Sequence, residues 1–480
     1  MPKLWLREEC PTSARPRTAH VAAGRTRSRV LHRIALLGLF ACFFFMDGIR
    51  PRDAYALTKP AWSVFVYLDG DNELGTFARE SFRQLTRLPD SPDLRIVVLY
   101  DGPERDDTYT FVIKHGMKLD PNAAQKLPDA PFEGEKLLSD AGTLEDFLSW
   151  GLKNHAGVRN ALVVWDHGHT WFSVCSDTRH IDDKKFTGRI TLMNAAIKKS
   201  LTAASVPTLD LLAFDSCLNG TVENAFEFRG VTRVFVASEE NVPVTSFPYS
   251  RCEDLDLDGQ CAAVGEETGI FSSLLGNPTL NEEQLASGFV QAYGRRYEDE
   301  TLSAVRSAKL TGLVDRVGAL SAEMIAAFAN GPAADQEAIR RARRACPEFA
   351  RPHWLADDIA CPVLSFFDIN PGFCASGQTV DLGSFCRALK STPRFSQLCE
   401  DAITALDAAI IDRVPAGPAS PTQPWPYGLS VFHPLDNASY MRRINRNKSY
   451  TPQPPPAIQA PEFATRARWH EYLQGYFAHN

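Results

Sequence analysis

The chain has 480 residues, of which 44% are hydrophobic and 23% are charged, and this balance excludes disordered, collagen-like and fibrous proteins. Residues 1–56 are basic, with ten Lys and Arg residues and four Asp and Glu residues. The remainder has 41 Lys and Arg residues and 54 Asp and Glu residues, which gives a net charge of −13. Binding to nucleic acid depends on an excess of Lys and Arg that neutralises phosphates. The acidic balance therefore argues against a nucleic-acid partner.

The N-terminus has the pattern of an export signal. A basic stretch precedes thirteen apolar residues, Ile34–Met46, whereas a membrane-spanning helix needs about 20. Ala54 and Ala56 then supply the small residues of a cleavage site. We predict that residues 1–56 are a signal peptide. An uncleaved anchor is the alternative, and it is the one case that places the protein at a membrane. Under either interpretation the rest of the chain is exported to the periplasm, the envelope or the exterior.

The number of cysteines agrees with export. Nine of the eleven cysteines lie beyond the leader, which allows four disulfides and leaves one thiol. None shows the CxxC spacing of a zinc site, and disulfides are the default in an exported protein. Cys252 and Cys261 flank a polar loop and are a candidate local pair. The remaining thiol needs another role.

Strand and helix patterns alternate along residues 57–330, which we treat as one domain. Strands are predicted over residues 62–68, 94–100, 108–114, 160–165, 209–214 and 231–237, and helices over 74–86, 142–154, 190–204, 219–229, 281–297 and 310–330. The main strands are apolar throughout, which indicates a mostly parallel sheet covered on both faces. The fold class is therefore α/β. Thr143 is the candidate cap of the second helix.

The pattern is weaker in residues 331–480, a C-terminal accessory region that completes the core, occludes the site or binds a partner. Its parts are a basic helix (335–345), a Cys-rich stretch without a clear period (346–399) and a short strand (428–432). Two Pro-rich linkers lie at 414–426 and 452–461.

Candidate catalytic residues follow two of the predicted strands. The strand at 160–165 is followed by DHGH, which contains His167 and Gly168, and the strand at 209–214 is followed by DSC, which ends at Cys217. Parallel strands bring their carboxyl ends to one edge of the sheet, where ligands bind. A thiol acts as a nucleophile when a base or a positive charge stabilises the thiolate, and histidine is the usual partner. We therefore expect His167 and Cys217 to meet.

The surroundings of this pair favour acyl transfer. The predicted helix at 219–229 begins soon after Cys217, and a helix N-terminus stabilises a thiolate. The backbone N–H groups of Gly168 and Cys217 are candidates for an oxyanion hole. The sequence thus predicts a cysteine nucleophile at this edge.

These residues resemble the clostripain family of cysteine peptidases, relatives of caspases, legumain and gingipains. The segments that carry the resemblance are WSVFVYLDGDNEL (62–74), TLEDFLSWGLKNHAGVRNALVVWDHGHTW (143–171), LDLLAFDSCLNGTVENAFEF (209–228), VFVASEENVP (234–243) and GLSVFHP (428–434). The resemblance implies a caspase-like three-layer sandwich and a protein or peptide substrate, with no cofactor required for the chemistry. It implies that His167 is the catalytic histidine and Cys217 the nucleophile of a dyad, so that Asp166 and Asp215 are structural.

The chain departs from the family pattern at three places. The family often has DHGxG, and His169 stands at the second glycine. An Asp after the fifth strand is associated in the family with a preference for Arg or Lys, and Thr245 stands there. A cationic side chain needs a buried carboxylate to offset its desolvation, so specificity stays open, with Glu239 and Glu240 as candidate substitutes in the pocket. Family members are also often cut between the His and the Cys, and the loop 175–189 contains Lys and Arg.

The run Asp254-Leu-Asp256-Leu-Asp258-Gly is a candidate metal site. Alternating carboxylates before a glycine favour coordination of Ca²⁺ by oxygen. The twelfth position of an EF-hand loop would be Gly265, so the run is not an EF-hand. A calcium loop of another kind and a plain acidic turn stay open, and the calcium dependence known in the clostripain family favours the first.

The predicted function is that of an exported cysteine endopeptidase, with Ca²⁺ as a candidate ligand. The alternative is a catalytically inactive, peptidase-like binding protein on the same fold, which the residues at His169 and Thr245 motivate. A zinc hydrolase built on His167, His169 and Cys175 is a third interpretation, although these residues lack a helical spacing that would fix the geometry. The oligomeric state stays open.

Overall fold

The computed structural model describes residues 59–119, 134–177, 188–250, 269–297, 300–346, 378–414, 426–437 and 461–479, together with residues 127, 130, 132, 348, 349, 440 and 450. Lys59–Asn480 form one compact unit, which crosses the predicted boundary at residue 330. The predicted leader, the acidic run from Asp254 to Asp258 and most of the two Pro-rich stretches lie outside the described residues. No described helix is long and apolar enough to cross a lipid bilayer.

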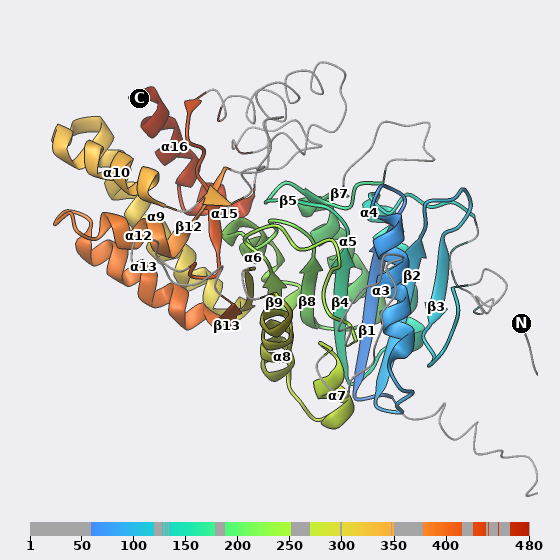
Figure 1. Cartoon of the computed structure of the whole chain (residues 1–480). Coiled ribbons are helices and arrows are strands. Elements are labelled where there is room, and N and C mark those ends of the chain that lie inside the picture. The colour runs from blue at the N-terminus through green and yellow to red at the C-terminus, as the bar shows by residue number, and fades with distance from the viewer. Residues whose placement is uncertain are drawn as a thin grey trace, which may run out of the picture. The chain divides into compact units, whose positions relative to one another are not determined.

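An eight-stranded sheet forms the centre of the unit (Figure 1). Its strands, in spatial order, are β13 (Ile410–Val414), β10 (Leu302–Arg306), β9 (Thr232–Ala237), β8 (Leu209–Asp215), β4 (Arg159–Trp165), β1 (Trp62–Asp69), β2 (Leu94–Asp101) and β3 (Tyr109–Val112). The five strands from β9 to β2 run parallel, while β3 and β10 flank them in the antiparallel direction. The predicted α/β class with a mostly parallel sheet is confirmed.

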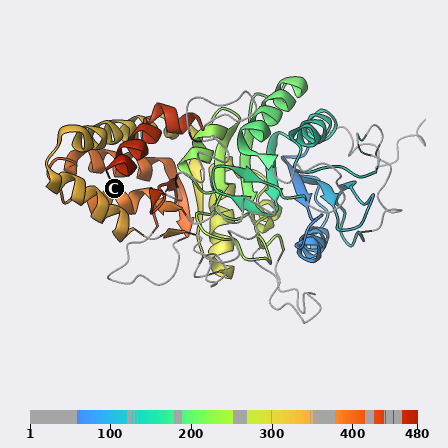
Figure 2. The ribbon, with the colours of Figure 1, turned by 90° about the horizontal axis from the view of Figure 1, so that it is seen from above.

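Helices cover both faces of this sheet, so the unit has three layers (Figure 2). The helices on one face are α3 (Gly75–Arg87), α7 (Ser272–Gly276) and α8 (Glu282–Arg296). Those on the other are α4 (Ala141–His155), α5 (Ile190–Ala204), α6 (Val222–Phe228) and α9 (Ser307–Asn330). Asp140 is the N-cap of α4, because its side chain accepts a hydrogen bond from the Gly142 N–H at 3.0 Å. The prediction of Thr143 as the cap is therefore wrong.

Each central strand supplies side chains to two separate hydrophobic cores. In β1, Phe65 and Tyr67 belong to the core beneath α4, whereas Val64 and Val66 belong to the core beneath α3. Successive side chains of a strand point to opposite faces, so burial on both faces requires a continuous apolar run. The apolar runs in the sequence are explained by this arrangement.

Residues beyond 330 add strands and helices to the same unit. Their elements are α10 (Ala333–Ala345), β11 (Glu348–Phe349), β12 (Thr379–Asp381), α12 (Leu382–Leu389), α13 (Ser396–Ala409), β14 (Ser430–Phe432), α15 (Glu462–Arg466) and α16 (Trp469–Ala478). β13 is the last strand of the main sheet, and α13 and α16 pack on α9 (Figure 1). The apolar side chains of α10, α12, α13 and α16 join the core on the α4 face.

The described cysteines form no disulfide. They are Cys175, Cys217, Cys346, Cys386 and Cys399. The expected disulfides are therefore not found among them, and the candidate pair Cys252 and Cys261 lies outside the described residues.

Candidate active site

The predicted histidine and cysteine follow two strands that lie side by side. β4 and β8 pair in parallel, with Trp165 opposite Asp215. His167 and Cys217 each come two residues after this pair, so both lie at the carboxyl edge of the sheet. The His167 side chain is 23% exposed, and Cys217 is also partly exposed. Each residue is thus partly exposed, although Nε2 of His167 is itself buried.

Gly168 lies directly against the turn that carries Cys217. A Cβ atom at Gly168 would overlap the carbonyl oxygen of Cys217 and Oδ1 of Asn219. Asn219 also joins the two turns, because its Nδ2 donates to the Thr170 carbonyl at 2.7 Å and its Oδ1 accepts from the Ser216 hydroxyl at 2.6 Å. The turn after β4 and the turn after β8 are therefore locked together, and only glycine fits at the contact.

Asp215 anchors the segment on the other side of Cys217. Both of its oxygens accept from the Phe247 N–H at 3.1 Å, and Oδ2 accepts from the Tyr249 hydroxyl at 2.7 Å. Burial raises the pKa of Asp215 to about 7, while these hydrogen bonds lower it. The side chain is 3% exposed, so its function is to hold the 247–249 segment in place.

Asp166 holds neighbouring segments in place in the same way, in the turn that carries His167. Its Oδ1 accepts from Asn72 Nδ2 at 2.9 Å, and its Oδ2 accepts from the Ser176 N–H. Burial raises the pKa of Asp166, and the neighbouring His167 opposes that rise. Both oxygens of this buried carboxyl are thus occupied by hydrogen bonds within the chain. The arrangement agrees with the structural role that the resemblance implies.

His167 has a carboxylate neighbour that sequence reasoning missed. Its Nε2 lies 3.0 Å from Oε1 of Glu73, which is 68% exposed. Burial lowers the pKa of His167, but Glu73 and Asp166 outweigh it, so that the pKa lies above its usual value. Glu73 therefore favours the protonated imidazole. The polar turn after the first strand was the available signal, since it ends in Asn-Glu.

The surroundings of Cys217 disfavour its thiolate. Burial, with the nearby carboxylates of Glu240 and Asp215, raises the pKa of the thiol to about 11. The Val242 N–H opposes this by donating to Sγ at 3.4 Å. The sulfur therefore has one weak stabilising donor from the chain and an acidic environment. A proton acceptor is required before it can attack.

The helix expected after Cys217 is present and begins three residues later than predicted. α6 begins at Val222, five residues after Cys217, and its Thr221 cap accepts from the Asn224 N–H at 3.1 Å. Stabilisation of a thiolate by its N-terminus stays a prediction. The residue after the cysteine, Leu218, has φ of +61° and donates its N–H to the Glu240 carbonyl at 3.0 Å. Cys217 thus lies in a tight turn between β8 and the capped start of α6.

The three predicted pocket residues have different surroundings. Glu239 is 1% exposed, and its Oε2 accepts from the Gly428 N–H at 3.0 Å, which ties it to the C-terminal region. Burial and the nearby Asp381 both raise its pKa. Glu240 is partly exposed, whereas the Thr245 hydroxyl lies 2.7 Å from the Tyr297 hydroxyl. A pocket role for Glu240 and Thr245 stays a prediction, and the carboxyl of Glu239 is engaged elsewhere.

His169 is buried beside His167. It is 4% exposed, and its ring stacks on that of His167 with centroids 6.3 Å apart. Its Nε2 lies 3.3 Å from the Ser176 hydroxyl. The side-chain groups near Cys175 that have a metal-binding geometry among the described residues are carboxylates, not these histidines, which weakens the zinc interpretation. Most of the loop 175–189 lies outside the described residues.

Comparisons with known proteins agree with this geometry. The model of the clostripain family matches residues 66–442. Clostripain of Hathewaya histolytica is 25% identical over 221 residues, which are 40% of this chain and 41% of that protein, so the match spans about two fifths of that relative.

Solved structures share the fold. An inactive zymogen C11 protease from Parabacteroides distasonis has a TM-score of 0.52 and 14% identity. A secreted C11 cysteine protease from Bacteroides thetaiotaomicron, in complex with an irreversible peptide inhibitor, has a TM-score of 0.52 and 15% identity. Each match covers 85% of this chain and 99% of the other. The caspase-like α/β sandwich is confirmed by these neighbours, and the extent of the family match shows that this chain belongs to the clostripain family.

Proposed function

We propose that the protein is an exported cysteine endopeptidase in which Cys217 is the nucleophile and His167 the base. The observation that carries the proposal is the contact of Gly168 with the Cys217 turn, which fixes both groups at one sheet edge. The family supports a peptide substrate, and the pattern of residues 1–56 supports export. The chemistry requires no cofactor.

The reaction starts from the Cys217 thiol and the neutral form of the His167 imidazole, and the Glu73 carboxylate stabilises the imidazolium that forms. The Cys217 thiol passes its proton to the His167 imidazole as sulfur attacks the peptide carbonyl carbon. A C–S bond forms, and the carbonyl electron pair moves to oxygen, which the N–H groups of Gly168 and Cys217 are proposed to hold. Collapse of this intermediate expels the amine, which takes the proton from His167. Water then hydrolyses the thioester, with His167 as its base.

We infer the primary specificity from the candidate pocket residues Thr245 and Glu240. Thr245 is bonded to Tyr297, so this position presents a neutral pair where a carboxylate would favour Arg or Lys. Glu240 is the nearest described acid of the candidate pocket, since its charge acts on Cys217. We therefore expect no strict preference for basic residues, and a weaker preference that depends on Glu240.

The test is a positional-scanning library of fluorogenic peptides, applied to the purified protein, to Cys217→Ala and to Cys386→Ala as a control. Cys386 is a buried cysteine of α12, so its loss should leave the specific activity unchanged. Loss of the nucleophile should lower kcat at least about 1,000-fold. Full activity of Cys217→Ala would refute the proposal.

The rival function predicts a different pattern. An inactive peptidase-like binding protein would cleave no peptide while melting cooperatively, and a peptide-based inhibitor would not label Cys217. An endopeptidase should be labelled by a peptide-based inhibitor in the wild-type protein and not in Cys217→Ala, as mass spectrometry can record. A strict preference for Arg or Lys would contradict the argument from Thr245 and leave the nucleophile in place.

A further inference from the structure

The segment 238–242 follows β9 and runs along the turn that carries the proposed nucleophile. Three hydrogen bonds join the segment to this turn. They are the Gly220 N–H with the Ser238 carbonyl at 2.6 Å, the Leu218 N–H with the Glu240 carbonyl at 3.0 Å, and the Val242 N–H with the sulfur of Cys217 at 3.4 Å. The position of the segment therefore decides the position of the thiol.

The Glu239 side chain ties this segment to the C-terminal region through a pair of carboxyl groups. Its Oε2 accepts from the Gly428 N–H at 3.0 Å, and Oδ2 of Asp381 accepts from the preceding N–H, that of Tyr427, at 2.6 Å. Asp381 ends β12, and its Oδ1 accepts from the Ser384 N–H at 2.5 Å. Both acids are at most 1% exposed. Two consecutive N–H groups thus hold two buried carboxyls next to each other.

One shared proton satisfies all four oxygens of the pair. Three of them accept from backbone N–H groups, whereas the fourth, Oε1 of Glu239, is buried and accepts from no donor in the described part of the chain. A proton on this oxygen makes it a donor to Asp381, and the two side chains are within hydrogen-bond reach. Two buried carboxylates without that proton would repel each other in a poorly solvated space.

The charges around the pair agree with a single proton. Burial and then the charge of Asp381 raise the pKa of Glu239 well above its ordinary value. Burial also raises the pKa of Asp381 to about 6, while hydrogen bonds from Ser384 and Glu239 lower it. Arg413 supplies a positive charge that lowers both pKa values, and the Cys386 thiol is a further titratable neighbour. Near neutral pH the pair therefore consists of a protonated Glu239 and an ionised Asp381.

We propose that Glu239 and Asp381 are positioning residues for Cys217, and that the proton they share holds the segment 238–242 against the nucleophile. When this proton leaves, the two carboxylates repel each other, the segment separates from the C-terminal region, and the turn of Cys217 loosens. The C-terminal region thus takes part in positioning the thiol, and cleavage slows as the pH rises. This inference rests on the proposed peptidase function and adds to it a role for residues beyond 330.

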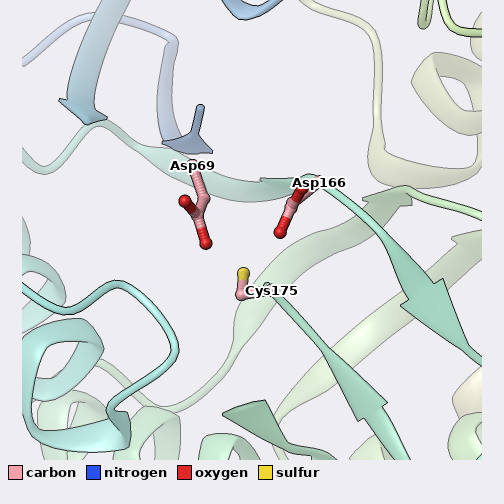
Figure 3. A group of neighbouring side chains, drawn as sticks. All are labelled: Asp69, Asp166 and Cys175. Atoms are coloured by element: carbon pink, nitrogen blue, oxygen red, sulfur yellow. The ribbon is translucent and has the colours of Figure 1, made fainter. Parts of the chain in front are cut away.

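Other buried acids lie at the same sheet edge and also titrate. Figure 3 shows the carboxyls of Asp69 and Asp166 around the thiol of Cys175. Both oxygens of Asp166 accept from donors of the chain, and its charge raises the pKa of Asp69 after burial. These groups are present in the wild type and in every variant of Glu239. A difference between those proteins therefore reports on the pair of Glu239 and Asp381.

The test measures kcat/KM for a fluorogenic peptide from about pH 6 to about pH 10 in the full-length wild type and three variants. Glu239→Gln keeps a donor that cannot ionise, so it should retain most of its activity at high pH, whereas the wild type should lose at least about tenfold. Asp381→Asn turns an amide donor toward an N–H such as that of Tyr427, so it should be at least about tenfold less active at every pH. Glu223→Gln removes a matched buried acid outside the segment and should keep the wild-type fall.

The Tm gives a readout that needs no peptidase activity. The folded wild type retains the proton of Glu239 at pH values where the unfolded chain has lost it, so its stability falls as the pH rises above the ordinary pKa of a glutamate. Its Tm should therefore fall by at least about 2 °C relative to that of Glu239→Gln. Parallel Tm profiles overturn the shared proton.

The positioning role is overturned by parallel kcat/KM profiles of the wild type and Glu239→Gln, or by loss of the wild-type fall in Glu223→Gln. A wild type that cleaves no peptide at any pH refutes the proposed function instead. The rate at which iodoacetamide alkylates Cys217 then takes the place of kcat/KM in the same comparison, because alkylation also depends on the position of the thiol.

Discussion

Two neighbouring stretches of one sheet edge bury carboxyl groups in opposite ways. At the ends of β4 and β8, Asp166 and Asp215 accept hydrogen bonds on both oxygens. At the ends of β1 and β2, Asp69 and Asp101 accept a hydrogen bond on one oxygen, and the other is buried without a partner among the described residues. An unsatisfied buried polar group costs about 1–3 kcal/mol. The first pair is thus completed by hydrogen bonds within the chain, whereas each carboxyl of the second pair keeps one buried oxygen without a partner among the described residues.

The largest effect is expected at the turns after β4 and β8, which the contact at Gly168 holds together. Gly168→Ala places a methyl group on the Cys217 carbonyl and must separate the turns after β4 and β8. A misplacement of about 1 Å can reduce catalysis on the order of 100-fold, so kcat/KM for a peptide should fall by at least about that factor. Gly312→Ala is the control, because a Cβ there, in α9, meets open space. It should retain activity and gain up to about 1 kcal/mol of stability. Equal kcat/KM values in the two variants would show that the turns are not locked.

A pair of Asp to Asn substitutions tests the two stretches directly. Urea unfolding at pH 8 in EDTA should show a loss of up to about 3 kcal/mol for Asp215→Asn, because the amide NH₂ that replaces one carboxylate oxygen is a donor that faces the Phe247 N–H and is left without an acceptor. Asp101→Asn should change stability by less than about 1 kcal/mol, since Asn keeps the acceptor for Thr108 and removes a repelling charge. Similar losses in both variants would mean that the hydrogen-bond count does not separate the two stretches.

Glu223 extends the comparison, because it is a buried carboxyl group that does not belong to an acidic cluster. Its Oε1 accepts from the Phe432 N–H and the Tyr450 hydroxyl, both at 2.9 Å, and burial raises its pKa to about 7. The folded protein therefore retains this proton in a pH range where the unfolded chain has lost it, so stability falls as pH rises from about 5 to 8. The wild type should lose about 2 kcal/mol more than Glu223→Gln over this range, as measured by unfolding at each pH. Parallel pH profiles would contradict the assignment.

The central strands and the helices between them could be predicted, because a strand buried on both faces needs a continuous apolar run. β10 and β13 could not. They pair with each other across more than a hundred residues, and β13 consists of five partly buried residues that include Asp412 and Arg413. Helix α12 and the start of α13 lie in the Cys-rich stretch, and the two helices pack on each other and on the distant helices α10 and α9. A single sequence does not display such long-range pairing.

Residues of the site could be predicted where one short segment carries the signal, and not where the fold brings distant segments together. His167 and Cys217 were found because each follows a recognisable strand. Glu73 comes from the turn after β1 and reaches His167 only in the fold. The buried cluster of Asp69, Asp101 and Asp177 had a local signal, since the strands ending at Asp69 and Asp101 are both followed by glycine, but its third member comes from a distant segment. The protonated state of Cys217 depends on burial, which the sequence does not show.

The position of β13 also matters for how the chain folds. This strand closes the open side of β10, yet it begins at residue 410, more than a hundred residues after β10 ends. An intermediate that has formed the earlier strands but not β13 presents the unpaired N–H and C=O groups of β10 to other molecules, and such edges promote aggregation. Once in place, β13 carries Asp412 and Arg413 at the outermost position, and charges there discourage the addition of a foreign strand. The late segment of the chain thus protects the early sheet from self-association.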